Sequence, residues 1–252
     1  MIEAQGLSKH YHDRLVVEDV TLQIPRGGVT AIIGPNGAGK STLLSMISRL
    51  TPMSAGTVEI DGLDVTKTAG HELAKKLSIL RQHNQTSLRL SVRDLVAFGR
   101  FPHSGGRLTD ADQKHIDEAL DYLNLHEYQH RHLDELSGGQ RQRAYVAMVM
   151  CQDTDYVLLD EPLNNIDMRH AVDMMQLLRR AADDKGKTVV VVLHDINFAS
   201  CYSDYLVAMR NGKLAWQGTP AEVMRSEILS ELYEIPMQVH ELNNQRICVY
   251  FR

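Results

Sequence analysis

The sequence predicts an α/β fold in which a parallel β-sheet is covered by helices on both faces. Three observations lead to this prediction. Strands that are apolar throughout, such as 29–33, 156–159 and 188–193, alternate with helical patterns, as in a sheet that is buried on both sides. A glycine-rich loop joins the first of these strands to a helix. From residue 85 to about 152 the pattern changes to helices joined by polar loops, which indicates a helical insertion into the α/β core.

The glycine-rich loop has the features of a phosphate-binding loop. Its glycines allow successive backbone N–H groups to point at one anion, and the helix that follows adds the positive end of its dipole. Lys40 can reach the outer phosphates of a nucleoside triphosphate, and the hydroxyl of Ser41 can ligate the accompanying Mg²⁺. An ordinary turn needs neither residue at these offsets. The predicted phosphate-binding residues are Gly34, Pro35, Asn36, Gly37, Ala38, Gly39, Lys40, Ser41 and Thr42.

The composition excludes several other classes of protein. The chain has 252 residues and a formal net charge of -5, so no general positive field would attract nucleic acid. The three cysteines are far apart and lack C-x-x-C spacing, which argues against a disulfide framework or a zinc knuckle. The longest apolar run, 189–193, is too short to span a bilayer, and we expect no secretory signal. Contact with a membrane would therefore go through a partner.

The flanking segments predict local elements around the core. Residues 2–28 alternate apolar and polar side chains around a turn at His12-Asp13, which predicts a strand pair. Asn211-Gly212 predicts a tight hairpin, and a last small hairpin is expected to turn near Asn243-Asn244. Helix starts are predicted at Ser91, Thr109 and Ser137.

Two carboxylates follow the strand 156–159 at the sheet edge where the phosphate loop is expected. Asp160 is placed to hold Mg²⁺, and Glu161 is then available to polarise an attacking water. The alternative is a solvated acidic pair at a strand end. The phosphate loop upstream favours the catalytic interpretation.

The segment Leu136 to Gln140 repeats the anion-binding pattern, because a serine caps a helix beside two glycines. A second nucleotide site in this chain would need its own lysine and its own acidic strand end, and the sequence offers neither. The simplest geometry is that this segment contacts the outer phosphate held by another copy of the chain, so that two copies close around two nucleotides. The predicted contact residues are Ser137, Gly138, Gly139 and Gln140.

This segment is one of several motifs that resemble the nucleotide-binding subunit of ATP-binding cassette (ABC) transporters. The others are the phosphate loop, Asp160, and His194 at the end of a strand. The resemblance extends over essentially the whole chain. The resemblance implies a P-loop NTPase (RecA-like) core with an antiparallel β subdomain and an inserted α-helical subdomain. It divides the single domain into a core of residues 1–84 and 153–252 and a helical subdomain of residues 85–152. It further implies ATP hydrolysis with Mg²⁺ in a homodimer under membrane permease subunits.

The resemblance also implies roles for single residues. Tyr11 would stack on adenine, although an exposed strand aromatic is the alternative. Gln82 would meet Mg²⁺ and sense the membrane partner. Asp167, in the loop Asn164-Asn165-Ile166-Asp167, would contact the opposite nucleotide site of the dimer. His194 would contact the outer phosphate. The family more often has Ser-Ala or Thr-Asn where this loop has two asparagines.

Residues 96–102 resemble a segment of the importers for iron chelates, haem and cobalamin; the alternative is a helix end at Gly99 with Arg100 on the surface. The resemblance is greatest to the ATPase of ferric siderophore importers, a peripheral subunit on the cytoplasmic face of the inner membrane, with a substrate-binding protein outside. The alternatives are import of haem or cobalamin, or a soluble mechanical ATPase of DNA repair or translation. His126, His130 and His132 could place two imidazoles on one helical face, but metal binding there is not favoured.

Overall fold

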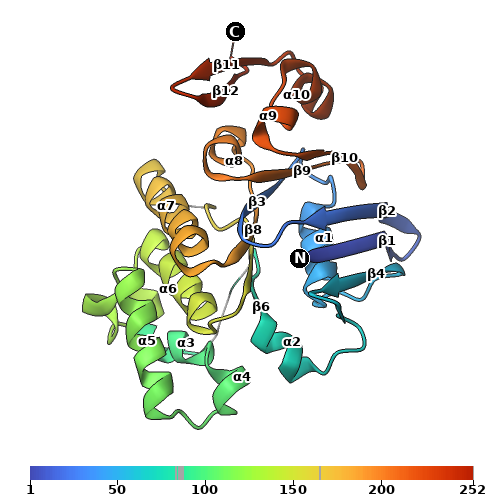
Figure 1. The fold of residues 1–252 in the computed structure, drawn as a ribbon. Helices are drawn as coiled ribbons and strands as arrows, with labels where there is room; N and C mark the ends of the chain where they lie inside the picture. The colour runs from blue at the N-terminus through green and yellow to red at the C-terminus, as the bar shows by residue number, and fades with distance from the viewer. Residues whose placement is uncertain (83, 85–87, 165, 252) are drawn as a thin grey trace. The chain divides into compact units, whose positions relative to one another are not determined.

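The structure is a computed structural model that describes residues 1–82, 84, 88–164 and 166–251. The chain forms two compact units, one of residues Met1–Thr68 and Leu178–Arg252 and one of residues Ala69–Leu177 (Figure 1). The second unit contains the predicted helical insertion, whose limits at 85 and 152 stay a prediction. Residue 85 lies outside the described residues, as does Asn165 of the loop that contains Asp167.

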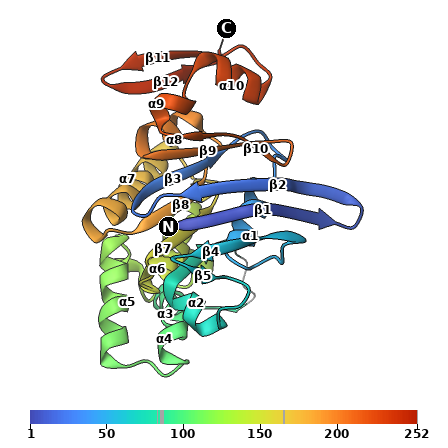
Figure 2. The same ribbon diagram turned by 45° about the vertical axis from the view of Figure 1, so that its right-hand side comes forward.

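The first unit contains an antiparallel sheet with the strand order β2-β1-β4-β5. Figure 2 shows these strands side by side. The predicted pair around His12-Asp13 is present, with Ile2 opposite Ile24. Inward side chains at every second position, such as Ile2 and Ala4, are buried, as expected for a sheet with one covered face. The strands are β1 (Ile2–Tyr11), β2 (Arg14–Ile24), β4 (Ala55–Ile60) and β5 (Leu63–Asp64).

The same unit contains parallel strands. β3 (Gly28–Ile33) lies between β8 (Thr188–Val192) and β9 (Tyr205–Arg210) and is parallel to both. All five residues of β8 are buried, which explains its uninterrupted valine run. The hairpin from β9 to β10 (Lys213–Gly218) turns through Asn211 and Gly212, both with positive φ, as the predicted tight turn requires.

The remaining elements of this unit are short. A last hairpin turns through Asn243 and Asn244 as predicted, and its strand β12 packs against α8. The elements are α1 (Lys40–Ile47), α8 (Ile196–Tyr202), α9 (Pro220–Val223), α10 (Ser226–Tyr233), β11 (Gln238–Leu242) and β12 (Gln245–Val249).

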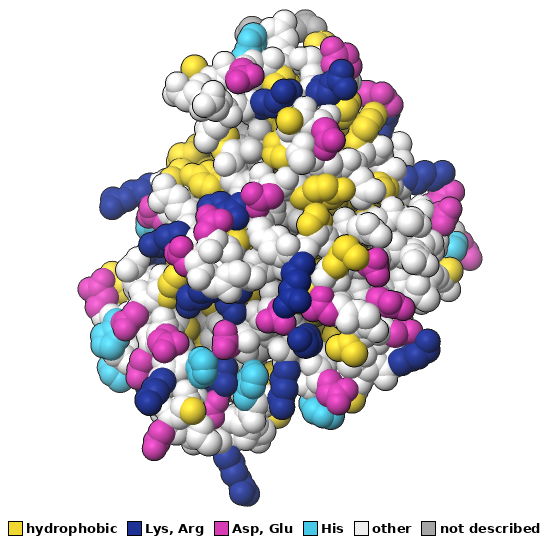
Figure 3. All heavy atoms as spheres, viewed as in Figure 1, with side chains coloured by type: hydrophobic (Ala, Val, Ile, Leu, Met, Phe, Trp, Pro, Cys, Tyr) yellow, Lys and Arg dark blue, Asp and Glu magenta, His cyan; other side chains and the backbone are white. Residues whose placement is uncertain are grey.

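The second unit is mainly helical, with two parallel strands, β6 and β7. Helices α3, α5 and α6 pack against one another, and Ser91, Thr109 and Ser137 cap them through the predicted capping boxes. Over this unit, the face drawn in Figure 3 carries acidic and basic side chains interspersed with histidines. The elements are α2 (Gly70–Lys76), β6 (Leu77–Leu80), α3 (Val92–Phe98), α4 (Phe101–Ser104), α5 (Asp110–Tyr122), η1 (His126–Tyr128), η2 (Leu133–Glu135), α6 (Gly138–Cys151), β7 (Tyr156–Asp160) and α7 (Met168–Lys185), whose last turns belong to the first unit.

Candidate functional site

The predicted phosphate loop lies between β3 and α1 in the first unit, so the expected order of strand, loop and helix is confirmed. Glycine is required at two of its positions. A Cβ on Gly34 would lie 2.1 Å from the backbone oxygen of Met209, and one on Gly39 would lie 2.9 Å from that of Val16. Gly39 adopts a left-handed conformation with φ of 95°, directly before α1 begins at Lys40. The backbone thus forms a tight cradle that a side chain would disrupt.

Lys40 lies inside this cradle. Its side chain is buried, and Nζ donates hydrogen bonds to the backbone oxygens of Gly34 at 2.8 Å and of Pro35 at 2.9 Å. Ser41 and Thr42 follow on the first turn of α1 and are half-buried. A buried ammonium group beside a helix N-terminus favours an anionic ligand.

His194 lies close to the loop in the same unit. It follows β8, and Leu193 N donates to Ile32 O at 3.1 Å, so His194 and the loop extend from the same ends of neighbouring parallel strands. The next residue, Asp195, caps α8 by accepting hydrogen bonds from Asn197 N and Phe198 N. His194 is exposed at this edge, where α/β sheets bind their ligands.

Tyr11 ends β1 and is exposed. The Nζ atom of Lys9 lies 5.0 Å from the centroid of its ring, a cation–π distance. The ring is thus accessible, as an adenine platform would need to be, but the same exposure fits an ordinary strand aromatic.

The two carboxylates predicted at the end of β7 belong to the second unit. Asp160 and Glu161 are 7% and 8% exposed, so neither is an ordinary solvated acid. Glu161 has a φ of 52°, an unusual backbone conformation that is enriched at functional sites. Its Oε2 atom accepts hydrogen bonds from Gln82 Nε2 at 2.6 Å and from Asn164 Nδ2. The carboxylate that we expected to be available to water is therefore held by two amides.

The serine-glycine segment forms the start of α6 as predicted. Ser137 Oγ accepts a hydrogen bond from Gln140 N at 3.3 Å, and Gln140 Oε1 accepts one from Ser137 N at 3.0 Å. This reciprocal cap fixes Gly138 and Gly139 in the first turn of a helix of 14 residues. The N–H groups of such a first turn have no partner within the helix and are suited to bind an anion.

The predicted residue Asp167 stands just before α7. Its Oδ1 atom accepts a hydrogen bond from His170 N at 3.0 Å, and Oδ2 lies 2.7 Å from His170 Nδ1. These bonds hold the pKa of the Asp167 carboxyl below its usual value.

More than half of the chain matches a known family. Residues 17–164 match the family described as "ABC transporter". The chain belongs to the ABC transporter family and is an ATPase of that family.

Similar proteins agree with this assignment. This ABC chain is 52% identical to the petrobactin import ATP-binding protein YclP of Bacillus subtilis (strain 168), over 100% of both chains. It is 38% identical to the iron(3+)-hydroxamate import ATP-binding protein FhuC of the same organism, over 99% of this chain and 94% of that protein. Its fold matches the dimeric ATP-binding cassette MJ0796 bound to ADP and phosphate, with a TM-score of 0.78, 28% identity, and coverage of 87% and 99% of the two chains.

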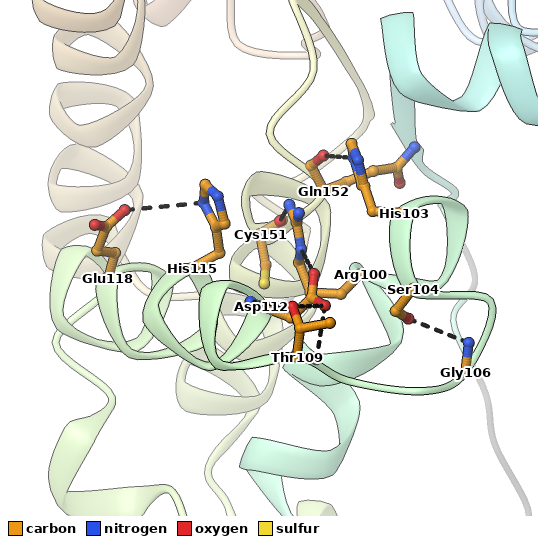
Figure 4. Close-up of polar contacts among 10 residues, drawn as sticks. All are labelled: Arg100, His103, Ser104, Gly106, Thr109, Asp112, His115, Glu118, Cys151 and Gln152. Carbon is orange, nitrogen blue, oxygen red and sulfur yellow. Dashed lines mark hydrogen bonds and ion pairs between the residues drawn. The ribbon is translucent and has the colours of Figure 1, made fainter.

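Arg100 of this ABC chain is not on the surface, so the alternative interpretation of residues 96–102 is wrong in that respect. Arg100 Nε donates to Asp112 Oδ1 at 2.9 Å, and Nη1 donates to the backbone oxygen of Cys151 at 2.9 Å (Figure 4). Both side chains are more than nine-tenths buried. Thr109 also bonds the Asp112 carboxyl, and with Arg100 it lowers the pKa of that group. The ion pair thus joins the end of α3 to α5 and α6.

The three histidines 126, 130 and 132 do not lie on one helical face, because only His126 is helical, in the short 3₁₀ turn η1. His126 Nδ1 lies 3.2 Å from Asp121 Oδ1. Within the described part of the chain, no group of three or more His, Cys, Asp or Glu residues is arranged to hold a metal ion. Nor does any helix found there have the length and apolar character needed to cross a membrane.

Sequence reasoning missed three residues that contact the ABC motifs. Asn164 bonds Glu161, His170 bonds Asp167, and the hydroxyl of Tyr233 accepts a hydrogen bond from Gly34 N at 3.1 Å. Burial raises the pKa of Tyr233, so its hydroxyl stays protonated. The departure from the family pattern at Asn164 was the one signal available. His170 and Tyr233 resemble ordinary helix residues in the sequence.

Proposed function

We propose that this chain is the ATP-hydrolysing subunit of a bacterial importer that takes up a ferric siderophore through a membrane permease. The observation that carries the proposal is the 52% identity, over the full length of both chains, with a petrobactin import ATP-binding protein. The more distant hydroxamate importer subunit differs in cargo but also serves an iron chelate. Petrobactin is therefore the first cargo to test.

The phosphate loop is proposed to bind the ATP phosphates. Support comes from the glycine cradle and from Lys40, whose Nζ already donates to two backbone oxygens and would exchange them for phosphate oxygens. Tyr11 is proposed to stack on the adenine. Of the remaining residues of the loop, 36–38 would supply backbone N–H groups and 41–42 hydroxyls, while Pro35, which has no backbone N–H, would line the loop.

The oxygen atoms of Ser41, Gln82 and Asp160 are proposed to hold Mg²⁺. A hydroxyl, an amide carbonyl and a buried carboxylate at a strand end suit a hard cation that prefers oxygen ligands. Mg²⁺, when bound, would balance the negative charge on the outer phosphates.

Glu161 is proposed to act as general base toward the attacking water, and His194 to contact the outer phosphate. A positioned base contributes roughly 10²–10⁴ in rate. Because the amides of Gln82 and Asn164 both bond Oε2, they restrict the orientation of the carboxylate, as the proposed base would require.

ATP is proposed to join two copies of the chain. Ser137, Gly138, Gly139 and Gln140 of one copy would contact the outer phosphate held by the other, and Asp167 would contact the opposite site. The proposal is supported by the capped start of α6 and by the dimeric state of the cassette MJ0796. Hydrolysis would remove the bridging charge, and the dimer would open.

The dimer is proposed to work at the cytoplasmic face of the cell membrane, beneath permease subunits that receive cargo from an external substrate-binding protein. Gln82 is proposed to relay closure to the permease. Its bond to Glu161 supports this role, because it joins the residue proposed to sense the permease to the proposed base.

Growth under iron limitation tests the proposal. A strain without the gene is supplied in turn with ferric petrobactin, a ferric hydroxamate or haem, and in a separate assay with cobalamin. We expect loss of growth on petrobactin, rescue by the wild-type gene, and no rescue by Glu161→Gln. Growth on every iron source would overturn the siderophore assignment, and a defect confined to haem or cobalamin would reassign the cargo. Copurification with a polytopic membrane protein separates an importer from a soluble mechanical ATPase.

A further inference from the structure

His170 lies between two motifs that the proposed dimer uses, although neither the motif pattern nor the proposed mechanism assigns it a role. It is in the first turn of α7, three positions after Asp167. Its Nδ1 atom lies 2.7 Å from Asp167 Oδ2. Asp167 is ionised at neutral pH, since its pKa is lowered, and an ionised carboxylate can only accept hydrogen bonds. The Nδ1 atom of His170 therefore carries the proton, and this bond fixes the orientation of the ring.

The ring of His170 also lies beside Gly139 of the serine-glycine segment. A Cβ added to Gly139 would be in van der Waals contact with the ring, 3.4 Å from His170 Cγ and 3.6 Å from Cδ2, so the space between the glycine and the ring has room for a methyl group and little more. One imidazole thus bonds the loop before α7 through its nitrogen and lies beside the start of α6 with its carbon edge.

We propose that His170 is a positioning residue that holds Asp167 and Gly139 in a fixed relative position, so that both engage the second copy of the chain together when ATP is bound. This inference rests on the proposed ATP-joined dimer. A rigid pair of contacts costs less conformational entropy at the moment of dimer formation than two contacts that must be ordered separately. His170 would therefore act on dimer formation rather than on the binding of ATP to the phosphate loop of its own chain.

Two substitutions separate the bond of the ring to Asp167 from its position beside Gly139. His170→Leu keeps apolar bulk near Gly139 and removes the nitrogen that bonds Asp167. His170→Asn places an amide N–H near the position of Nδ1 and removes the ring from Gly139. Neither removes the backbone N–H of residue 170, which donates to the Asp167 carboxylate that caps α7, so α7 keeps its start.

His115 provides a matched control in the same unit. Its Nδ1 atom lies 4.0 Å from Glu118 Oε2, also at a spacing of three residues, and its side chain is 35% exposed, against 33% for His170 (Figure 4). It lies on α5 and is assigned no role at the ATP site. The control variants are His115→Leu and His115→Asn.

The test measures ATP-driven dimerisation in a Glu161→Gln background, by size-exclusion chromatography with light scattering over a range of ATP concentrations. We expect His170→Leu to raise the ATP concentration at half-dimerisation about tenfold, the size expected from one charge-assisted hydrogen bond. His170→Asn should restore part of this loss. The affinity of the monomer for a fluorescent ATP analogue, measured at low protein concentration, should not change in either variant.

The outcomes distinguish the role of His170 from the proposed ATP-joined dimer on which it rests. If Glu161→Gln alone stays monomeric with ATP, the ATP-joined dimer is wrong, and the role of His170 falls with it. If Glu161→Gln dimerises and His170→Leu shifts the curve no more than His115→Leu, only the positioning role is wrong. The positioning role would also be wrong if His170→Leu weakened the monomer's affinity for the fluorescent ATP analogue as much as it weakened dimerisation, because His170 would then act within its own chain.

Discussion

The side chain of Gln82 donates a hydrogen bond from Nε2 to Oε2 of Glu161 at 2.6 Å, across 79 positions of the sequence. The same oxygen accepts a second bond from Asn164 Nδ2. Two amides that bond one oxygen restrict the rotation of the carboxylate. A general base must be held in this way if it is to meet its water in one orientation.

Replacing Asn164 by aspartate should impair the base directly. Asn164→Asp puts a carboxylate against Oε2 of Glu161, and two adjacent carboxylates cannot both stay ionised at low cost. We expect kcat to fall about tenfold with little change in KM for ATP. Steady-state ATPase assays check this. Asn164→Ser, which introduces the residue common in the family, is the milder control, and an unchanged kcat in Asn164→Asp would contradict the positioning of Glu161 by this amide.

Glu161→Gln should retain ATP binding and lose most turnover, by roughly 10²–10⁴, because the amide cannot accept the proton of water. It should also accumulate a dimer, since hydrolysis no longer removes the bridging phosphate charge. ATPase assays and light scattering with and without ATP measure both effects. Near-normal turnover, or a monomer in the presence of ATP, would refute the assignment of Glu161 as the base.

Ser137→Arg should abolish turnover while leaving the nucleotide affinity of the monomer intact. The large side chain would disrupt the cap of α6 and occupy the space proposed for the phosphate of the second copy. Titration of the monomer with a fluorescent ATP analogue, beside an ATPase assay, tests both parts. Loss of affinity in the monomer would mean that this segment acts within its own chain.

Arg100→Ala should destabilise the second unit by about 3–5 kcal/mol, because it leaves the buried carboxylate of Asp112 without its ionic partner. Chemical denaturation followed by circular dichroism measures the change. Arg93→Ala is the control. Its ion pair with Asp117 is partly exposed, with side-chain exposures of 28% and 49%, and should contribute well under half as much. Equal losses of stability in Arg100→Ala and Arg93→Ala would contradict the role of burial at Arg100.

The same ion pair predicts a pH dependence of stability. The pKa of Asp112 is lowered in the folded chain by Thr109 and Arg100. Its stabilising contribution is therefore fully present above the pKa of an unfolded aspartate, about 3.9, and is lost as the pH falls through the lower pKa of the folded state. The wild type should lose this contribution in acid, and Arg100→Ala should lose less of it. Denaturation midpoints from pH 6 down to roughly pH 2 test the difference.

Tyr233→Phe should raise KM for ATP several-fold, because the buried N–H of Gly34 loses its acceptor and the phosphate loop becomes less well positioned. Tyr122→Phe is a matched control, since the Tyr122 hydroxyl donates to Leu177 O at 2.9 Å in the other unit. Both variants should lower the melting temperature by similar amounts. Only Tyr233→Phe should change KM, and an equal change in both would show that the effect is global.

The sequence by itself determined the features that depend on a few neighbouring residues. The phosphate loop could be predicted because a left-handed turn and a close backbone approach demand glycine at Gly34 and Gly39. The capped helix starts at Ser91 and Ser137 followed from side chains that bond N–H groups three residues away. The turn at Asn211 was predictable for the same local reason.

Only the tertiary structure decided which distant side chains meet. The burial of Arg100 depends on Asp112 and on the backbone of Cys151, 51 positions away. The position of His170 beside Gly139 depends on how the tertiary fold brings together the first turns of α7 and α6. Such contacts leave no periodic or local signal, because they arise when helices and strands pack and polar groups must find partners away from water. The positions of the motifs and their local turns could thus be predicted from the sequence, whereas the residues that hold them in place were set by packing.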